Sequence, residues 1–328
     1  MASQSQQLSK IQYGTEGSSY GTETASYSEL HKVQSSEISS DNANIYERGL
    51  GEGLNIVKKY LGPFASGSSL VFDVEDFDIL KHWVGPKTGA GSVGDPYILT
   101  EATKTAIGSQ LEPFSLERSN DTEATKSVEL LTGGIGTQFT LSGSLNSVLS
   151  CSSQLIGQKT TERTTGETFV KSTINSFVML NGTWKWGATP SAIAGVQSFD
   201  FTMTNLMNIE QSRSIESRFI LQPQLDGRDY KLRVTILMAQ ALAATIITNF
   251  YTGGLTPEDG STTINPTADL EFKIELVSGN KLAYIWLDQC AIDRIVRTVN
   301  VGGGLVLLTF DVTADEGKGN VPITWWEI

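Results

Sequence analysis

Two stretches of the chain share one pattern of polar and apolar positions. They read VQSSEISSDN at residues 33–42 and VQSFDFTMTN at residues 196–205, and four of the ten positions are identical. The alternation of polar and apolar residues predicts a β-strand in each stretch. The two stretches are 163 positions apart in a chain of 328 residues, which is almost half its length. The pattern therefore predicts that the chain consists of two copies of one unit.

The segments that follow the two decapeptides correspond in the same way. Each decapeptide is followed by a connection of about 25 residues, 42–66 and 205–229, and then by a strand, SSLVFDV or YKLRVTIL, in which Val71 and Val234 are again 163 apart. Helical periodicity follows in residues 75–85 and 238–254, and alternating strands follow each helix. A recurrence of element order and spacing indicates a duplication. The expected fold is mainly β: two tandem, duplicated β-sandwich or barrel domains, each with a short flanking helix.

The domain limits follow from stretches without apolar periodicity. Residues 1–30 are polar and repeat Tyr-Gly-Thr-Glu, which predicts a flexible N-terminal arm that a partner would order. The polar stretch GQKTTERTTGETFVKST, residues 157–173, is the expected boundary. We therefore expect a first domain at 31–160 and a second domain at 161–328.

Charge and composition restrict the function. The net charge is −12 and the pI is about 4.7. These values argue against a surface that binds nucleic acid through clustered Lys and Arg. The sequence contains neither a secretory signal nor an apolar run long enough to span a membrane, so we expect a soluble protein made in the cytosol. Cys151 and Cys290 lie far apart without a CxxC spacing, and we expect both to be buried hydrophobic residues rather than disulfide or zinc ligands.

Sequence features that could carry chemistry have simpler structural explanations. GAGSVG at 89–94 matches GxGxxG but does not lie at a strand-to-helix turn, so it lacks the context of a phosphate loop. Nothing ties His31 or His82 to a nucleophile, and the acids of DVEDFD at 73–78 precede a predicted helix, where carboxylates are stabilised without a metal. We therefore expect no catalytic, cofactor-binding or metal site.

The tryptophan pairs Trp184/Trp186 and Trp325/Trp326 could form a platform for a sugar or a base. Trp184 and Trp186 are two residues apart on a predicted strand and so face one side, as residues of a core or of a subunit contact do. Packing is the preferred interpretation of these aromatic residues.

The order of motifs resembles one known family. IQYGTEGSSYGT, VQSSEISSDNANIYERGLGEGLNIV, SGSSLVFDVEDFDILKHWVG, GDPYILTEA, PFSLER and VQSFDFTMTN look like the tail tube proteins of tailed bacterial and archaeal viruses. The resemblance covers nearly the whole chain. It implies rings that stack into a hollow tail through which viral DNA is delivered, in a virion assembled in the host cytoplasm. It also implies contacts with copies of the same chain and with the tape measure, tail terminator or adaptor, and tip proteins. A soluble β-sandwich binding module for a carbohydrate or a receptor, on a virion or cell surface, is the alternative.

Three expectations follow for the assembly. Two domains per chain predict a trimeric ring with pseudo-sixfold symmetry whose joints are strand edges. The lumen is expected to be polar and acidic, so that DNA slides without being retained. The two long connections and the N-terminal arm are expected to lock rings together, with covering flaps as the alternative for the connections. The contact candidates are Tyr13, Tyr20, Arg48, Leu50, Val57, Lys58, Lys59, Tyr60, Arg213, Arg218, Phe219 and Ile220.

Overall fold

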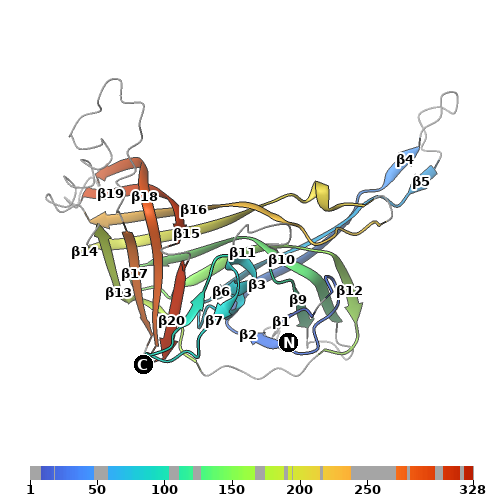
Figure 1. Cartoon of the computed structure of the whole chain (residues 1–328), viewed down its shortest axis with the longest axis horizontal. Helices are drawn as coiled ribbons and strands as arrows, with labels where there is room; N and C mark the ends of the chain where they lie inside the picture. Colours follow the sequence, from blue (N-terminus) through green and yellow to red (C-terminus); the bar gives the residue numbers. More distant parts are fainter. Residues whose placement is uncertain are drawn as a thin grey trace, which may run out of the picture.

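The computed structural model gives a mainly β protein (Figure 1). It describes residues 9–17, 19–47, 58–102, 111–120, 127–166, 174–187, 191–193, 195–214, 217–237, 271–278, 281–299, 306–317 and 321–327. Strands hold 66% of these residues and helices 4%, which confirms the predicted fold class. Among the described residues, no helix is both long and apolar enough to cross a bilayer.

Strands of the first half begin near the N-terminus. They are β1 (Ser9–Thr15), β2 (Ser28–Leu30), β3 (Val33–Asn42), β4 (Ile45–Glu47), β5 (Lys58–Tyr60), β6 (Phe64–Asp73), β7 (Lys87–Thr88), β8 (Tyr97–Leu99), β9 (Phe114–Asn120), β10 (Ser127–Ser144), β11 (Ser150–Gly157) and β12 (Lys159–Arg163). A short 3-10 turn, η1 (Asp78–Leu80), leads into the helix α1 (Lys81–Val84), which ends at Gly85.

The second half contributes the remaining strands. They are β13 (Val178–Gly187), β14 (Ser191–Ile193), β15 (Val196–Met207), β16 (Leu225–Leu237), β17 (Glu271–Ser278), β18 (Lys281–Val299), β19 (Val306–Gly317) and β20 (Ile323–Glu327), with a 3-10 turn, η2 (Glu210–Ser212), between β15 and β16. The predicted helix at 238–254 lies outside the described residues.

Eight strands form one continuous antiparallel sheet that joins the two halves. Their order is β3, β6, β11, β10, β15, β16, β19 and β18. The long strands β10 and β18 each also pair within a second layer: the first part of β10 pairs with β9 and β12, and the first part of β18 pairs with β17 and β20. β1 and β2 extend the β9 side, and β13 and β14 extend the β17 side.

The two halves follow the same strand order and the same register. β3 and β15 each have a bulge at the second residue of the shared decapeptide, Gln34 and Gln197, where the pairing with β6 or β16 shifts. β10 and β18 each skip one residue opposite their neighbour, Thr137 in β10 and Asp293 in β18. Bulges are specific features of a strand pair, so their recurrence supports the duplication hypothesis at the level of backbone pairing.

The register corrects one detail of the sequence comparison. Starting from the two bulges, the position equivalent to Val234 is Leu70 and not Val71, because β15 and β16 are joined by a connection one residue longer. Burial agrees, since Leu70 and Val234 are both 0% exposed whereas the neighbouring Val71 is only partly buried. A single added residue reverses which face of a strand a side chain occupies.

Residues 9–30 differ from the expected flexible arm. β1 lies between β9 and β2, with seven residue pairs to β9, and buries Ile11 completely. Two-sided pairing and core burial order this segment within the chain itself. Residues 1–8 lie outside the described residues. β12 likewise lies within the expected boundary stretch, so the change from one set of strands to the other falls between Arg163 and Val178.

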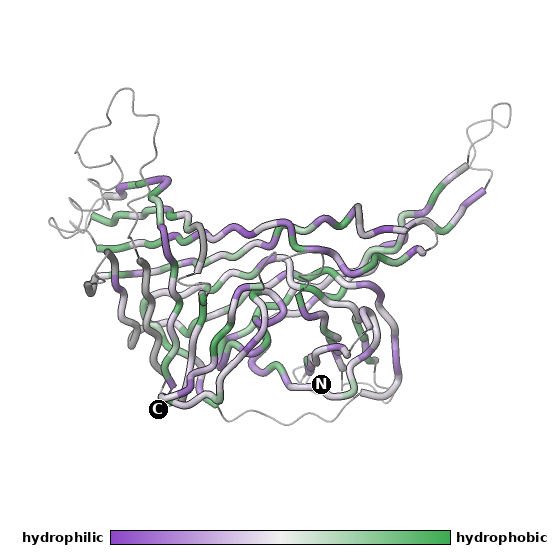
Figure 2. Tube along the Cα trace, viewed as in Figure 1, coloured by the Kyte–Doolittle hydropathy of each residue, from purple (hydrophilic) through white to green (hydrophobic). Residues whose placement is uncertain are grey.

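The core lies between the long sheet and the second layers. Alternate residues of β15 and β16 point into it, including Phe199, Phe201, Leu232 and Val234, and all four are at most 1% exposed. Cys151 and Cys290 are also buried and unbridged, as expected. Figure 2 shows the alternation of hydrophilic and hydrophobic residues along these strands. The opposite face of the sheet is therefore the polar one.

Candidate assembly surfaces

The side of the long sheet that faces away from the core is rich in hydroxyl groups. We call it the polar face. Strand alternation places on it the following residues from the first half and then from the second: Ser35, Glu37, Ser39, Asp41, Ser69, Val71, Asp73, Ser150, Ser152, Gln154, Ile156, Gln138, Thr140, Ser142; and Asp200, Thr202, Thr204, Leu206, Asp229, Lys231, Arg233, Thr235, Leu237, Leu307, Thr309, Asp311, Thr313, Arg294, Val296, Thr298. Both halves contribute, so the face is continuous across their junction.

Short side chains on the polar face bond to one another across strands. Thr140 and Thr202 join β10 and β15 with their hydroxyl oxygens 2.9 Å apart, and Thr235 and Thr309 join β16 and β19 at 3.0 Å. These contacts satisfy hydroxyl groups within the sheet.

Carboxylates outnumber bases on this face. The acids are Glu37, Asp41, Asp73, Asp200, Asp229, Asp293 and Asp311, and the bases are Lys231, Arg233 and Arg294. Arg233 is held by Asp311 through two hydrogen bonds of 2.7 and 3.2 Å, which neutralise both charges. The remaining field of the polar face is therefore negative.

The long sheet ends in two strand edges. Within the described residues, β3 pairs with β6 alone, and the Arg294–Val299 part of β18 pairs with β19 alone. Each edge presents backbone amide and carbonyl groups that can pair with another strand. The two edges lie at opposite ends of the same sheet.

A hairpin of β4 and β5 projects from the end of β3 and β6 (Figure 1). It carries exposed large apolar side chains: Ile45 at 56%, Tyr46 at 50%, Tyr60 at 48% and Leu61 at 66%. Lys58 and Lys59 are exposed on it as well, and the Lys59 ammonium lies 6.0 Å from the centre of the Tyr46 ring. Three of the predicted contact candidates, Lys58, Lys59 and Tyr60, therefore lie on a projecting surface. Arg48, Leu50 and Val57 lie outside the described residues.

The second long connection is packed against its own chain. Arg218 donates hydrogen bonds to the carbonyl oxygen of Gly62 and to the side chain of Asn42, and its own carbonyl accepts from the Phe64 amide at 2.9 Å. The Phe219 ring meets the Phe64 ring edge-on at 5.6 Å. These contacts hold residues 218–219 at the base of the projecting hairpin. The two connections, which the sequence analysis treats as equivalent, therefore differ.

Two further contact candidates of this connection also contact their own chain. Ile220 is 3% exposed, and its carbonyl accepts a hydrogen bond from Gln158. Arg213 is half-buried and lies 3.9 Å from the Glu210 carboxylate. They support the conformation of the connection.

The N-terminal candidates lie within the second layer. Tyr13 is 5% exposed, and its hydroxyl donates to Asp78 at 3.1 Å. Burial, and then the Asp78 charge, raise the pKa of Tyr13 well above its usual value. Tyr20 is half-buried, and its ring carbon lies near Gly133.

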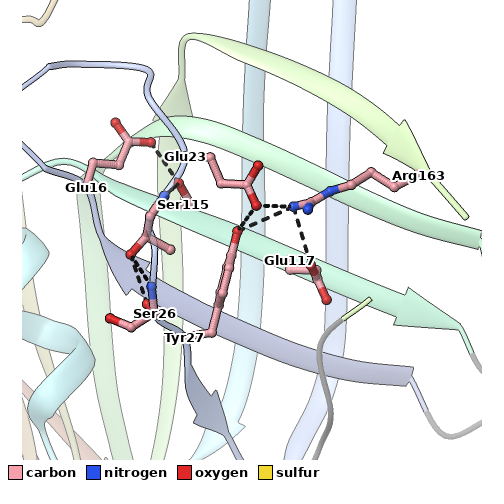
Figure 3. Close-up of polar contacts among 8 residues, drawn as sticks. Glu16, Glu23, Ser26, Tyr27, Ser115, Glu117 and Arg163 are labelled. Atoms are coloured by element: carbon pink, nitrogen blue, oxygen red, sulfur yellow. Dashed lines mark hydrogen bonds and ion pairs between the residues drawn. The ribbon is translucent and has the colours of Figure 1, made fainter. Parts of the chain in front are cut away.

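A polar network fastens residues 16–27 to the second layer (Figure 3). The Glu16 carboxylate accepts from the amides of Gly21 and Gly133, both at 2.7 Å, and from the Ser115 hydroxyl at 2.9 Å. Burial raises the pKa of Glu16 in spite of these hydrogen bonds. A second group brings together Tyr27, Glu23, Glu117 and Arg163, and the guanidinium of Arg163 lies 2.7 Å from Glu23 and 3.4 Å from Glu117.

Residues with possible catalytic chemistry are in structural roles. His82 is fully buried against the Phe114 ring, its Nδ1 lies 2.9 Å from the Glu112 carbonyl oxygen, and burial lowers its pKa to about 3. Trp184 is 3% exposed and packs on Phe199, and Trp325 is 4% exposed, as the packing interpretation predicts. The side chain of Trp186 lies outside the described set.

The GAGSVG loop and the acidic stretch are accounted for in the same way. In the loop, the amides of residues 90–92 all donate to the Asp95 carbonyl within 3.2 Å, which leaves none of them aimed at a phosphate. In the acidic stretch, Glu75 pairs with Lys32 at 2.8 Å, and Asp78 pairs with Lys81 and Lys87. Across the described ranges, no three His, Cys, Asp or Glu residues are grouped as a metal site would require.

The polar face is a candidate functional surface whose residues were not assigned from the sequence. Its signal is present in the sequence FDFTMTN, where Asp200, Thr202 and Thr204 alternate with apolar residues. The strand register is needed to show that the polar faces of the two halves lie on the same side of the sheet where β10 meets β15.

A large antiparallel sheet with a polar face, two open edges and a projecting hairpin has the features expected of a structural assembly protein. The family model for phage tail tube proteins matches residues 6–314, nearly the whole chain, and the chain therefore belongs to the phage tail tube protein family. The family is structural and places the protein in the tail of the virion, with self-assembly and other tail proteins as partners. A search of curated proteins finds no match.

Proposed function

We propose that three copies of this chain close into a ring of the tail tube, and that stacked rings form the channel through which viral DNA is delivered. The observation that carries this proposal is the continuous eight-stranded sheet, with one polar face and an open edge at each end. Each chain would contribute two repeated units, separated within the polar stretch after β12. Three chains then supply six units, and joining the β3 and β18 edges closes the long sheets into one ring without a free edge.

The polar face lines the channel in this assembly. Uncharged hydroxyl groups and an excess of carboxylates offer few positive charges to phosphate, and the Arg233–Asp311 pair neutralises one of them. Binding to DNA strengthens with each phosphate that Lys or Arg neutralises. A lining of this kind lets DNA move through the bore without specific binding.

The projecting hairpin provides the contact between rings. Ile45, Tyr46, Tyr60 and Leu61 expose apolar surface beside Lys58 and Lys59, a mixture that fits an interface with an apolar centre and a polar rim. Residues 218–220 support the hairpin from below rather than reaching the next ring.

Other tail proteins complete the structure. The tape measure protein would occupy the bore during assembly in the host cytoplasm, and terminator or adaptor and tip proteins would bind the two ends of the tube. The basis for these partners is the tail tube family.

Electron microscopy of the purified full-length protein tests the proposal. We expect rings or rods of constant bore, with three chains and six similar units around each ring. Rings of six chains and twelve units would contradict the trimer. Monomers that form neither rings nor rods at any concentration would contradict the tube function itself.

A further inference from the structure

We infer that β18 of one chain pairs antiparallel with β3 of the neighbouring copy, in a single register that places Arg294 opposite Asp41, Val296 opposite Ser39 and Thr298 opposite Glu37. The inference rests on the proposed ring, and it specifies the joint between its chains. It follows from a junction that already exists inside the chain.

The internal template is the junction of β10 and β15, where the first half meets the second. Its register pairs Gln138 with Thr204, Thr140 with Thr202 and Ser142 with Asp200. At the middle pair the two hydroxyl oxygens are 2.9 Å apart, so these side chains touch directly.

The shared bulges carry this register to the outer edges. β18 is equivalent to β10, with Asp293 at the place of Thr137, so Arg294, Val296 and Thr298 occupy the places of Gln138, Thr140 and Ser142. β3 is equivalent to β15 through the bulges at Gln34 and Gln197. Asp41, Ser39 and Glu37 then occupy the places of Thr204, Thr202 and Asp200.

The chemistry at the two edges agrees with this register. It places the Arg294 guanidinium opposite a carboxylate, where the internal junction has a neutral pair, and it places Thr298 opposite a second carboxylate. On the core side, Arg297 lies opposite Ile38, so the methylene stem of the arginine can cover the isoleucine.

Shifted registers lose these pairs. A slip of two residues in either direction leaves Arg294 opposite Ser39 or Ala43 and sets the exposed Val296 opposite Glu37 or Asp41. A slip of one residue sends every side chain to the other face. The charges therefore select the same register that the internal template gives.

A disulfide between Val296→Cys and Ser39→Cys tests the joint in full-length protein. In one chain these positions lie at opposite edges of the sheet, roughly 30 Å apart at about 4.8 Å per strand, far beyond the reach of a disulfide. Any bond between them therefore joins two chains. Cys151 and Cys290 are 0% exposed and do not compete.

We expect the double variant, oxidised after assembly, to give a ladder on non-reducing gels that stops at three chains. The matched control, Thr298→Cys with Ser39→Cys, is displaced by two residues and should link at least tenfold less. Equal linking of the two pairs, or linking of the control alone, in tubes of normal bore would overturn the register and leave the proposed function intact. If the wild-type chain formed neither rings nor tubes, both the register and the proposed function would be wrong.

Discussion

Trp83 and Gly136 show how one residue without a side chain positions the short helix on the sheet. Trp83 is fully buried, and its indole nitrogen donates to the carbonyl oxygens of Gln138 and Gln154, both at 3.0 Å. A Cβ on Gly136 would lie 2.2 Å from the indole ring. The Asn205 amide bonds the carbonyl oxygens of Trp83 and Gly136 at 2.9 Å each, which ties the helix to the junction of the two halves.

Gly136→Ala is expected to destabilise the protein by about 1–3 kcal/mol, because the added methyl group displaces a fully packed indole ring. Denaturant unfolding followed by tryptophan fluorescence measures the change. Gly94→Ala is the control, since nothing lies within 4 Å of a Cβ at that position and its unfolding midpoint should hardly move. Equal stability of the two variants would show that the ring has room to shift.

The contacts of some single residues could not be predicted from the sequence. Asn42 and Asn205 are identical in the repeated decapeptide, yet Asn205 is buried and binds the helix end, whereas Asn42 accepts a hydrogen bond from Arg218 at the base of the hairpin. The same residue type acquires two roles because different segments reach it. No local pattern contains that information.

At the scale of elements, regular strands were predictable and their partners were less so. Alternation predicts the strands around β15, β16 and β19, since one face of each is buried. β1 and β12 were missed because their polar residues hide the alternation and their order depends on pairing with β9 and β10. The two long connections have similar lengths, but only the contacts of Arg218 and Phe219 distinguish the packed connection from the projecting one.

Replacing residues 45–60 with a four-residue turn should give rings that remain soluble but do not elongate. The change removes most of the exposed apolar surface of the hairpin and leaves Gly62 and Asn42 to bind Arg218. Sedimentation and electron microscopy measure tube length. Leu61→Ser should weaken elongation in the same direction, because Leu61 is 66% exposed on this surface.

Leu221→Ser is the matched control for the hairpin, because Leu221 is 54% exposed but belongs to the second connection. It should leave tube length unchanged. Tubes of normal length from the shortened chain would mean that the hairpin is not the contact between rings.

At the scale of the whole molecule, one sheet unites both halves and separates a packed side from a polar side. Because every second residue on each strand faces away from the core, the polar face extends over the full width of the sheet. The net charge of the chain, −12, does not say which side chains the polar face carries, whereas the strand register does.

Gln154→Lys adds one positive charge per chain to the polar face, where Gln154 is exposed on β11. Virions assembled with this variant should release DNA more slowly, with the delay reduced by added salt, because each lysine adds a phosphate contact. Time-resolved DNA release measures the effect. Thr161→Lys, exposed on β12 in the second layer, is the control and should release DNA at the wild-type rate; an equal delay for both would refute the assignment of the lining.

The difference between the two long connections also bears on how neighbouring rings are oriented. With one projecting hairpin per chain, a ring of three chains carries three hairpins around a wall built of six similar units. Two stacked rings can then make equivalent hairpin contacts only at rotations of a third of a turn about the tube axis. The wall itself nearly repeats at every sixth of a turn. The angular alignment of the tail would thus be set by the asymmetry between two halves that otherwise share the same strand register.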